Sequence, residues 1–146
     1  MDQQFNVEVR TEPDRLFVIV SDLGCYDQFL DIVHRVETDH SDPSDPRPAW
    51  LVTLRAKVGP FARSKRLRMV QTVVEAPWRA RFERSERDGR EHSAWTLAAN
   101  IAPSPRGSTL TMSLSYRGRM WSPALEPLLE AQVSRAGANL EMLAAR

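Results

Sequence analysis

Residues 109–117 read TLTMSLSYR, so apolar and polar side chains alternate at every step of this segment. Successive side chains of a β-strand point to opposite faces, and such alternation therefore indicates a strand with one buried and one solvated face. The same pattern occurs in residues 50–58, 79–83 and 95–101. Together these segments predict an antiparallel sheet with one apolar face, which another element has to cover.

The C-terminal segment is the obvious cover for that face. After Ser122-Pro123, apolar residues recur at helical spacing, as is typical of an amphipathic helix: Leu125, Leu128, Leu129, Val133, Ala136, Leu140 and Leu143. Gly137 is unusual within a helix, where glycine costs about 1 kcal/mol relative to alanine. We therefore expect either a close approach of the helix to the sheet or open space beneath it at this position.

Shorter elements precede the sheet segments. Alternation over residues 5–9 predicts a first strand, and apolar spacing predicts two short helices, over about residues 13–21 and 26–32. Residues 33–39 read as a further strand, and residues 40–48 hold three prolines and form a surface loop. The count is about seven strands, with two short helices after the first.

Length and composition indicate a single folded unit. The 146 residues fit one domain over 1–146. Cys25 is the single cysteine, and no Cys/His spacing suggests a metal site, so we expect no metal and no cofactor. No basic leader and no membrane-spanning apolar run is visible, which predicts a cytoplasmic protein without a transmembrane segment. The sequence leaves the oligomeric state open between a monomer and a homodimer.

Charge is unevenly distributed although the formal net charge is only +1. Residues 1–54 carry 11 acidic and 4 basic side chains, and residues 55–90 carry 11 basic and 4 acidic ones. A solvated sheet face explains this composition. The alternative is a basic sheet face offered to an anionic partner; DNA is not expected, because no aromatic residues are interleaved for base stacking. The residues of this face would be Arg55, Arg66, Arg68, Arg79 and Arg81.

Four segments carry a resemblance to a known superfamily: Pro13-Asp14-Arg15-Leu16-Phe17, Val20-Ser21-Asp22-Leu23, Tyr26-Asp27-Gln28-Phe29-Leu30 and His34-Arg35-Val36-Glu37. With the order of elements, they resemble the START-like or SRPBCC superfamily, which includes polyketide cyclase/dehydrase, lipid transport-like and coenzyme Q-binding-like proteins. The resemblance spans nearly the whole chain. It implies an α+β helix-grip fold, in which a curved antiparallel sheet wraps around the long C-terminal helix and leaves an elongated cavity between them.

Strand parity and this resemblance together select candidate cavity residues. Tyr26 and His34 would lie at the cavity mouth, and Phe61 follows Gly59-Pro60 as a candidate gate. Gln71 and Tyr116 are the polar candidates, although Gln71 could instead be an edge residue and Tyr116 could simply bury its ring. His34 could equally lie on the surface. The remaining candidates are Trp50, Leu54, Met69, Phe82, Trp95, Met112 and Gly137.

Three functions remain open. The leading hypothesis is binding or transport of a small hydrophobic ligand, such as a lipid, an isoprenoid quinone or a polyketide, in the cavity. The first alternative is a polyketide aromatase/cyclase or dehydratase, in which Tyr116, His34 and Gln71 could transfer protons. No catalytic motif is visible, so the sequence leaves open whether the protein is an enzyme. The second alternative is a ribosome- or protein-interaction module that uses the Arg-rich sheet face.

Overall fold

The computed structural model describes residues 2–58, 60–118 and 122–146, without the side chains of residues 58, 61 and 122–125. Its elements follow one another in the predicted order. They are β1 (Asp2–Val9), α1 (Pro13–Val20), the 3-10 helix η1 (Leu23–Gln28), β2 (Val33–Thr38), β3 (Ala49–Val58), β4 (Phe61–Glu75), β5 (Arg79–Arg84), β6 (Trp95–Ser104), β7 (Gly107–Tyr116) and α2 (Ser122–Ala144).

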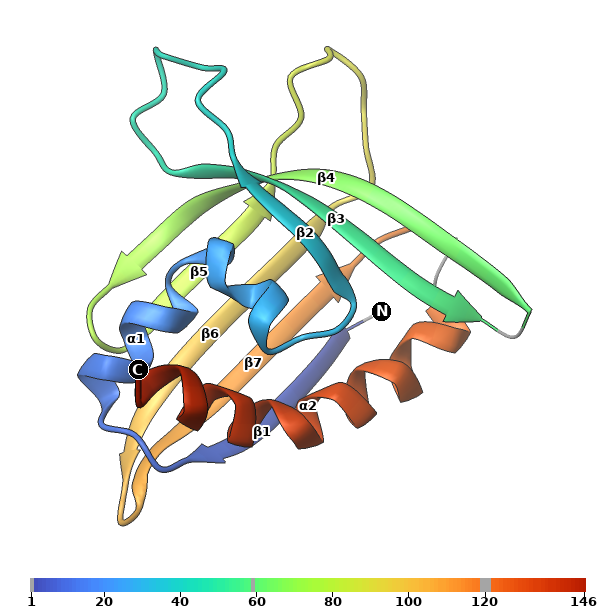
Figure 1. Ribbon diagram of the computed structural model, residues 1–146. Coiled ribbons are helices and arrows are strands. Elements are labelled where there is room, and N and C mark those ends of the chain that lie inside the picture. The colour runs from blue at the N-terminus through green and yellow to red at the C-terminus, as the bar shows by residue number, and fades with distance from the viewer. Residues whose placement is uncertain (1, 59, 119–121) are drawn as a thin grey trace.

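The seven strands form one antiparallel sheet in the order β1-β7-β6-β5-β4-β3-β2. The sheet curves around α2, which lies across its concave side (Figure 1). This confirms the predicted α+β architecture of a curved sheet wrapped around a long C-terminal helix. The long β3–β4 hairpin extends past the neighbouring strand, because β5 pairs with β4 over Met69–Glu75 and the preceding residues of β4 pair with β3.

The first short helix forms as predicted, with Pro13 in its first turn. The second short helix also forms, as a 3-10 helix over Leu23–Gln28, so its bounds differ from the predicted range of about residues 26–32. Asp22 precedes this helix, and its side chain accepts a hydrogen bond from the backbone N–H of Gly24 at 2.9 Å. This cap starts the helix at the residue after Asp22, earlier in the chain than predicted.

One end of the interior is filled by aromatic rings, and we call it the packed end. The ring centroids of Trp50 and Phe82 are 5.5 Å apart, and those of Tyr26 and Phe82 are 6.0 Å apart, both with edge-to-face geometry. Phe29 adds a fourth ring, 4.7 Å from Tyr26. Phe82 at the centre is fully buried. Edge-to-face contacts of this kind stabilise a core beyond the area they bury.

Two contacts fix α2 against the rest of the molecule. The side-chain oxygen Oε1 of Gln132, on the buried face of the helix, accepts a hydrogen bond from the backbone N–H of Ile32 at 2.8 Å. At Gly137, an added Cβ would lie 3.0 Å from the Cγ1 of Val7, so the glycine allows the helix to approach β1 closely. Of the two expectations for Gly137, close approach is the one observed.

Arg68, on the outer face of β4, is buried by contacts with Asp39 after β2 and with the segment that follows β5. Arg68 Nε donates to Asp39 Oδ2 at 2.7 Å, and Arg68 Nη1 donates to the carbonyl oxygen of Ser85 at 2.9 Å. The hydrogen bond from Arg68 lowers the pKa of Asp39 to about 2. The prediction that Arg68 belongs to an exposed basic face is therefore wrong, because this side chain is only 6% exposed.

Candidate functional site

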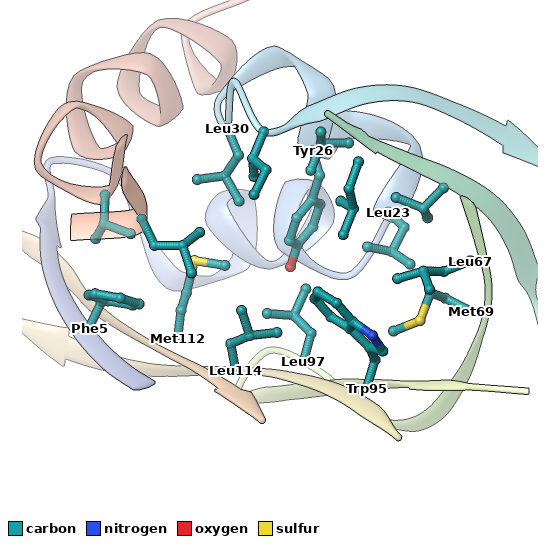
Figure 2. Close-up of a pocket in the computed structure, with 16 residues that line it drawn as sticks. Phe5, Leu23, Tyr26, Leu30, Leu67, Met69, Trp95, Leu97, Met112 and Leu114 are labelled. Atoms are coloured by element: carbon teal, nitrogen blue, oxygen red, sulfur yellow. The ribbon is translucent and has the colours of Figure 1, made fainter. Parts of the chain in front are cut away.

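A cavity of about 90 Å³ lies between the sheet and the first half of α2. Sixteen side chains line it, all of them aliphatic, aromatic or methionine (Figure 2). They come from β1, β2, β3, β4, β6, β7, η1, the segment after it, and α2. In Figure 2, Tyr26 and Leu30 point into the cavity from one side, and Met112, Leu114 and Trp95 point into it from the other. The apolar face that alternation predicted is the floor of this cavity.

Five of the residues selected from the sequence line the cavity: Tyr26, Leu54, Met69, Trp95 and Met112. They come from four strands and the 3-10 helix, so the fold brings together residues that are up to 86 positions apart in the chain. The four strand residues were selected because alternation places them on the inner face of the sheet. Tyr26 was selected from the resemblance.

Three apolar candidates lie elsewhere. Trp50 and Phe82 face inward as predicted but belong to the packed end, where their rings contact each other instead of lining open space. Gly137 lies against β1, where Val7 takes up the space that a side chain at position 137 would need. The side chain of Phe61, the predicted gate, lies outside the described residues.

None of the three polar candidates is part of the cavity lining. Gln71 is buried, and its Nε2 donates to the carbonyl oxygen of Ser21 at 2.8 Å, so the amide ties β4 to the end of α1. His34 is exposed on β2, where the register with β3 shifts between Val33 and Arg35. These positions separate the groups that the catalytic hypothesis needs to act on one ligand.

Tyr116 is buried at the end of β7, beside the cavity and not in its lining. Its ring is tilted against the cavity residue Trp95, with centroids 4.4 Å apart. An added Cβ at Gly118 would overlap the Tyr116 ring, so glycine is required where the chain turns across this tyrosine. Tyr116 pairs with Trp95 across β6 and β7 and packs beside its ring.

Two polar atoms belong to side chains of the lining. The hydroxyl of Tyr26 donates to the carbonyl oxygen of Val20 at 2.7 Å, and burial raises the pKa of Tyr26 well above its ordinary value. The indole Nε1 of Trp95 is buried and has no hydrogen-bond partner among the described residues. A buried unpaired donor is costly, and each such group calls for an explanation.

Most of the remaining lining residues were part of the predicted buried faces without being singled out as a site, whereas Leu23 and Ile32 were not predicted to face inward. Leu97 and Leu114 follow from strand alternation, and Leu129 and Val133 belong to the helical stripe. Sequence reasoning missed Gln132, whose polar side chain lies on the buried face beside that stripe. Its position between two apolar residues of the stripe was the available signal.

Within the described ranges 2–58, 60–118 and 122–146, no group of three or more His, Cys, Asp or Glu side chains is placed to hold a metal ion. The same part of the chain contains no helix with the length and apolar character needed to span a membrane.

Comparison with known proteins finds similarity in structure. No protein-family model matches the chain, and no curated protein matches it. Among solved structures, the protein TTHA0849 from Thermus thermophilus superposes with a TM-score of 0.72 at 15% identity, covering 99% of this chain and 97% of that one.

Two further similar structures are di-domain aromatase/cyclases. StfQ of the steffimycin biosynthetic pathway has a TM-score of 0.67 at 12% identity, over 99% of this chain and 52% of that one. BexL of the BE-7585A biosynthetic pathway has a TM-score of 0.68 at 14% identity, over all of this chain and 50% of that one. This chain thus spans about half the length of each di-domain protein. At these identities the likeness shows the fold, and that fold is helix-grip-like.

Proposed function

We propose that this protein binds a small hydrophobic molecule in the cavity between the sheet and α2. The observation that carries the proposal is a cavity of about 90 Å³ whose lining side chains are all aliphatic, aromatic or methionine. Protein interiors are close-packed, with few voids larger than a water molecule. An apolar cavity of about 150 Å³ in an engineered protein stays dry and binds benzene.

The cavity has a cost in stability that a ligand would offset. At about 24 cal/mol per Å³ of unfilled volume, a void of this size lowers the free energy of unfolding by about 2 kcal/mol. A guest that fills it restores the missing contacts and adds the transfer free energy of its own apolar surface. In its present shape the cavity accommodates a small ring or a short alkyl segment. The flexible side chains of Met69 and Met112 allow the lining to adapt to different guests.

The indole Nε1 of Trp95 is an unpaired donor, which favours a ligand with a hydrogen-bond acceptor placed near Trp95. A ligand carbonyl or hydroxyl oxygen could accept this hydrogen bond, since the described residues provide no acceptor. The lipid, isoprenoid quinone or polyketide expected from the sequence would each combine apolar surface with such oxygen atoms.

The proposal can be tested with the methionine methyl groups as reporters. Met69 and Met112 line the cavity, whereas Met142 is 61% exposed on α2 and serves as an internal control. In protein labelled with ¹³C at the methionine methyl groups, titration with naphthalene or octan-1-ol should shift the signals of Met69 and Met112 and leave that of Met142 unchanged. Saturable shifts at the two cavity methionines support the proposal. Absence of such shifts, together with no co-purifying apolar molecule in native mass spectrometry, would refute it.

The aromatase/cyclase hypothesis remains a second candidate because two similar structures carry that activity in their names. Its geometric support is weaker than that of ligand binding. The Gln71 amide donates to the Ser21 carbonyl, His34 is exposed, and Tyr116 lies beside Trp95 without lining the cavity. Turnover of a candidate polyketide, and its loss in Tyr116→Phe, would favour catalysis over simple binding.

The interaction-module hypothesis is weakened by the ion pairs of the sheet. Arg68 is buried against Asp39, while Arg79 and Arg81 form ion pairs with Glu75 and Glu83. Of the five arginines proposed for that face, Arg55 and Arg66 are the two without an ion pair in the described part of the chain. Salt-dependent co-sedimentation with ribosomes would revive this alternative.

A further inference from the structure

The inner face of β4 changes from apolar to cationic just beyond the cavity. Met69 and Leu67 line the cavity, and the next two residues of the same parity are Lys65 and Arg63. Residues two apart on a strand share a face, so both cations start out on the concave side of the sheet. The register agrees, since Lys65 pairs with the buried cavity residue Leu54.

Arg63 continues this arrangement one step further from the cavity. It pairs across the strands with Ala56, which is buried and therefore marks the inner face of β3. The outer face of the same hairpin carries Arg55, Lys57 and Arg66, none of them buried. The hairpin thus has cations on both faces, and the inner pair is the one next to the cavity.

Neither Lys65 nor Arg63 forms an ion pair with a residue that the structure describes. Residues 49–74 contain six basic and no acidic side chains. Among the ion pairs of the described residues, the one that includes a residue of this stretch joins Arg68 to Asp39. Lys65 is half-buried, and burial lowers its pKa, with a further contribution from the nearby positive charge of Arg84; Glu86 acts in the opposite direction. A partly desolvated cation beside an apolar cavity is stabilised by an anion placed against it.

We propose that the ligand of this cavity is an amphipathic anion, with its apolar part in the cavity and its acidic group against Lys65 and Arg63. The inference rests on the proposed function, because it specifies the chemical class of the molecule bound there. A carboxylate, a sulfonate and a phosphate share the relevant chemistry, namely a negative charge with several acceptor oxygens. Lys65 and Arg63 lie one and two steps from the cavity residue Leu67 along the inner face of β4.

The test compares two probes that differ only at the head group. Octanoate is ionised at neutral pH, and octan-1-ol is its neutral counterpart of equal chain length. Dissociation constants come from titrations followed by the methyl signals of Met69 and Met112. We expect octanoate to bind about three- to tenfold more tightly than octan-1-ol, with the difference shrinking at high salt.

Two double variants that remove the same charge locate the effect. Arg63→Gln with Lys65→Gln alters the inner face, and Lys57→Gln with Arg66→Gln alters the outer face of the same hairpin. The inner variant should bind both probes equally, whereas the outer variant should keep the preference for octanoate. All four side chains are exposed or half-buried, so both variants should remain folded, and thermal unfolding monitored by circular dichroism verifies this.

The outcomes separate this inference from the proposed function. If octan-1-ol and octanoate bind the wild-type protein equally well, ligand binding stands and the anion preference is refuted. The proposed anion site at Lys65 and Arg63 is also refuted if the inner variant still prefers octanoate. It is refuted likewise if the outer variant loses this preference as completely as the inner variant does. If neither probe binds the wild-type protein, this inference fails, and the proposed function fails with it when naphthalene also gives no shift and no apolar molecule co-purifies. A preference that disappears in the inner variant alone supports both.

Discussion

The packed end and the cavity lie side by side under one sheet, yet side chains fill the first and leave the second open. At the packed end, Phe82 is surrounded by the rings of Tyr26 and Trp50. At the cavity, Phe5, Leu97 and Leu114 face a space that no side chain occupies. Both regions consist of inward-facing apolar residues on neighbouring strands. The comparison shows that burial and inward parity are the same in a filled core and around a cavity, and that only the volume between facing side chains distinguishes them.

Truncation of a phenylalanine should distinguish the two regions most strongly. Phe82→Ala removes a fully buried ring from the packed end and should lower the free energy of unfolding by about 3–5 kcal/mol. Phe5→Ala removes a half-buried ring that already faces the cavity, so its cost should be clearly smaller. Urea unfolding of both variants measures the difference. Equal losses would mean that the cavity end is packed as tightly as the aromatic end.

Loss of the Gln132 hydrogen bond should have an intermediate effect. Gln132→Leu leaves the backbone N–H of Ile32 without its acceptor next to the cavity, and we expect a loss of about 1–3 kcal/mol in the free energy of unfolding. Glu130→Leu changes an exposed position of the same helix and is the control. If both variants unfold at the same urea concentration as the wild type, this hydrogen bond does not hold α2 over the cavity.

Filling the cavity should have the smallest effect on stability and the opposite sign. Leu97→Phe places extra atoms in the open space and should raise the free energy of unfolding by about 1 kcal/mol, while weakening the binding of octan-1-ol. Ala99→Leu adds atoms two residues further along β6, where Ala99 is already buried opposite Ala80, and should destabilise by about 1–3 kcal/mol. Stabilisation by both substitutions would show that the interior beside Ala99 has as much free space as the cavity.

The sequence was sufficient for the strands, the long helix and the inward parity of most lining residues, because these depend on local periodicity. It could not place the cavity, since Phe82 and Trp95 both face inward and differ only in what faces them across the interior. The role of Gln71 depends on a contact outside its strand, because its side-chain amide donates a hydrogen bond to the carbonyl oxygen of Ser21. The burial of Arg68 likewise depended on the loop over residues 39–48, whose path local patterns do not encode.

The unequal lengths of β4 and β5 bear on how a guest enters. The part of β4 that precedes Met69 is paired with β3 and extends beyond β5. Bending this region, in which β2 also pairs with β3, away from α2 breaks no ladder hydrogen bond between β4 and β5, so it costs far less than opening the centre of the sheet. Leu67 and Leu54 lie in this region and form one wall of the cavity. The proposed ligand would therefore enter and leave by flexing of one wall while the aromatic core stays intact.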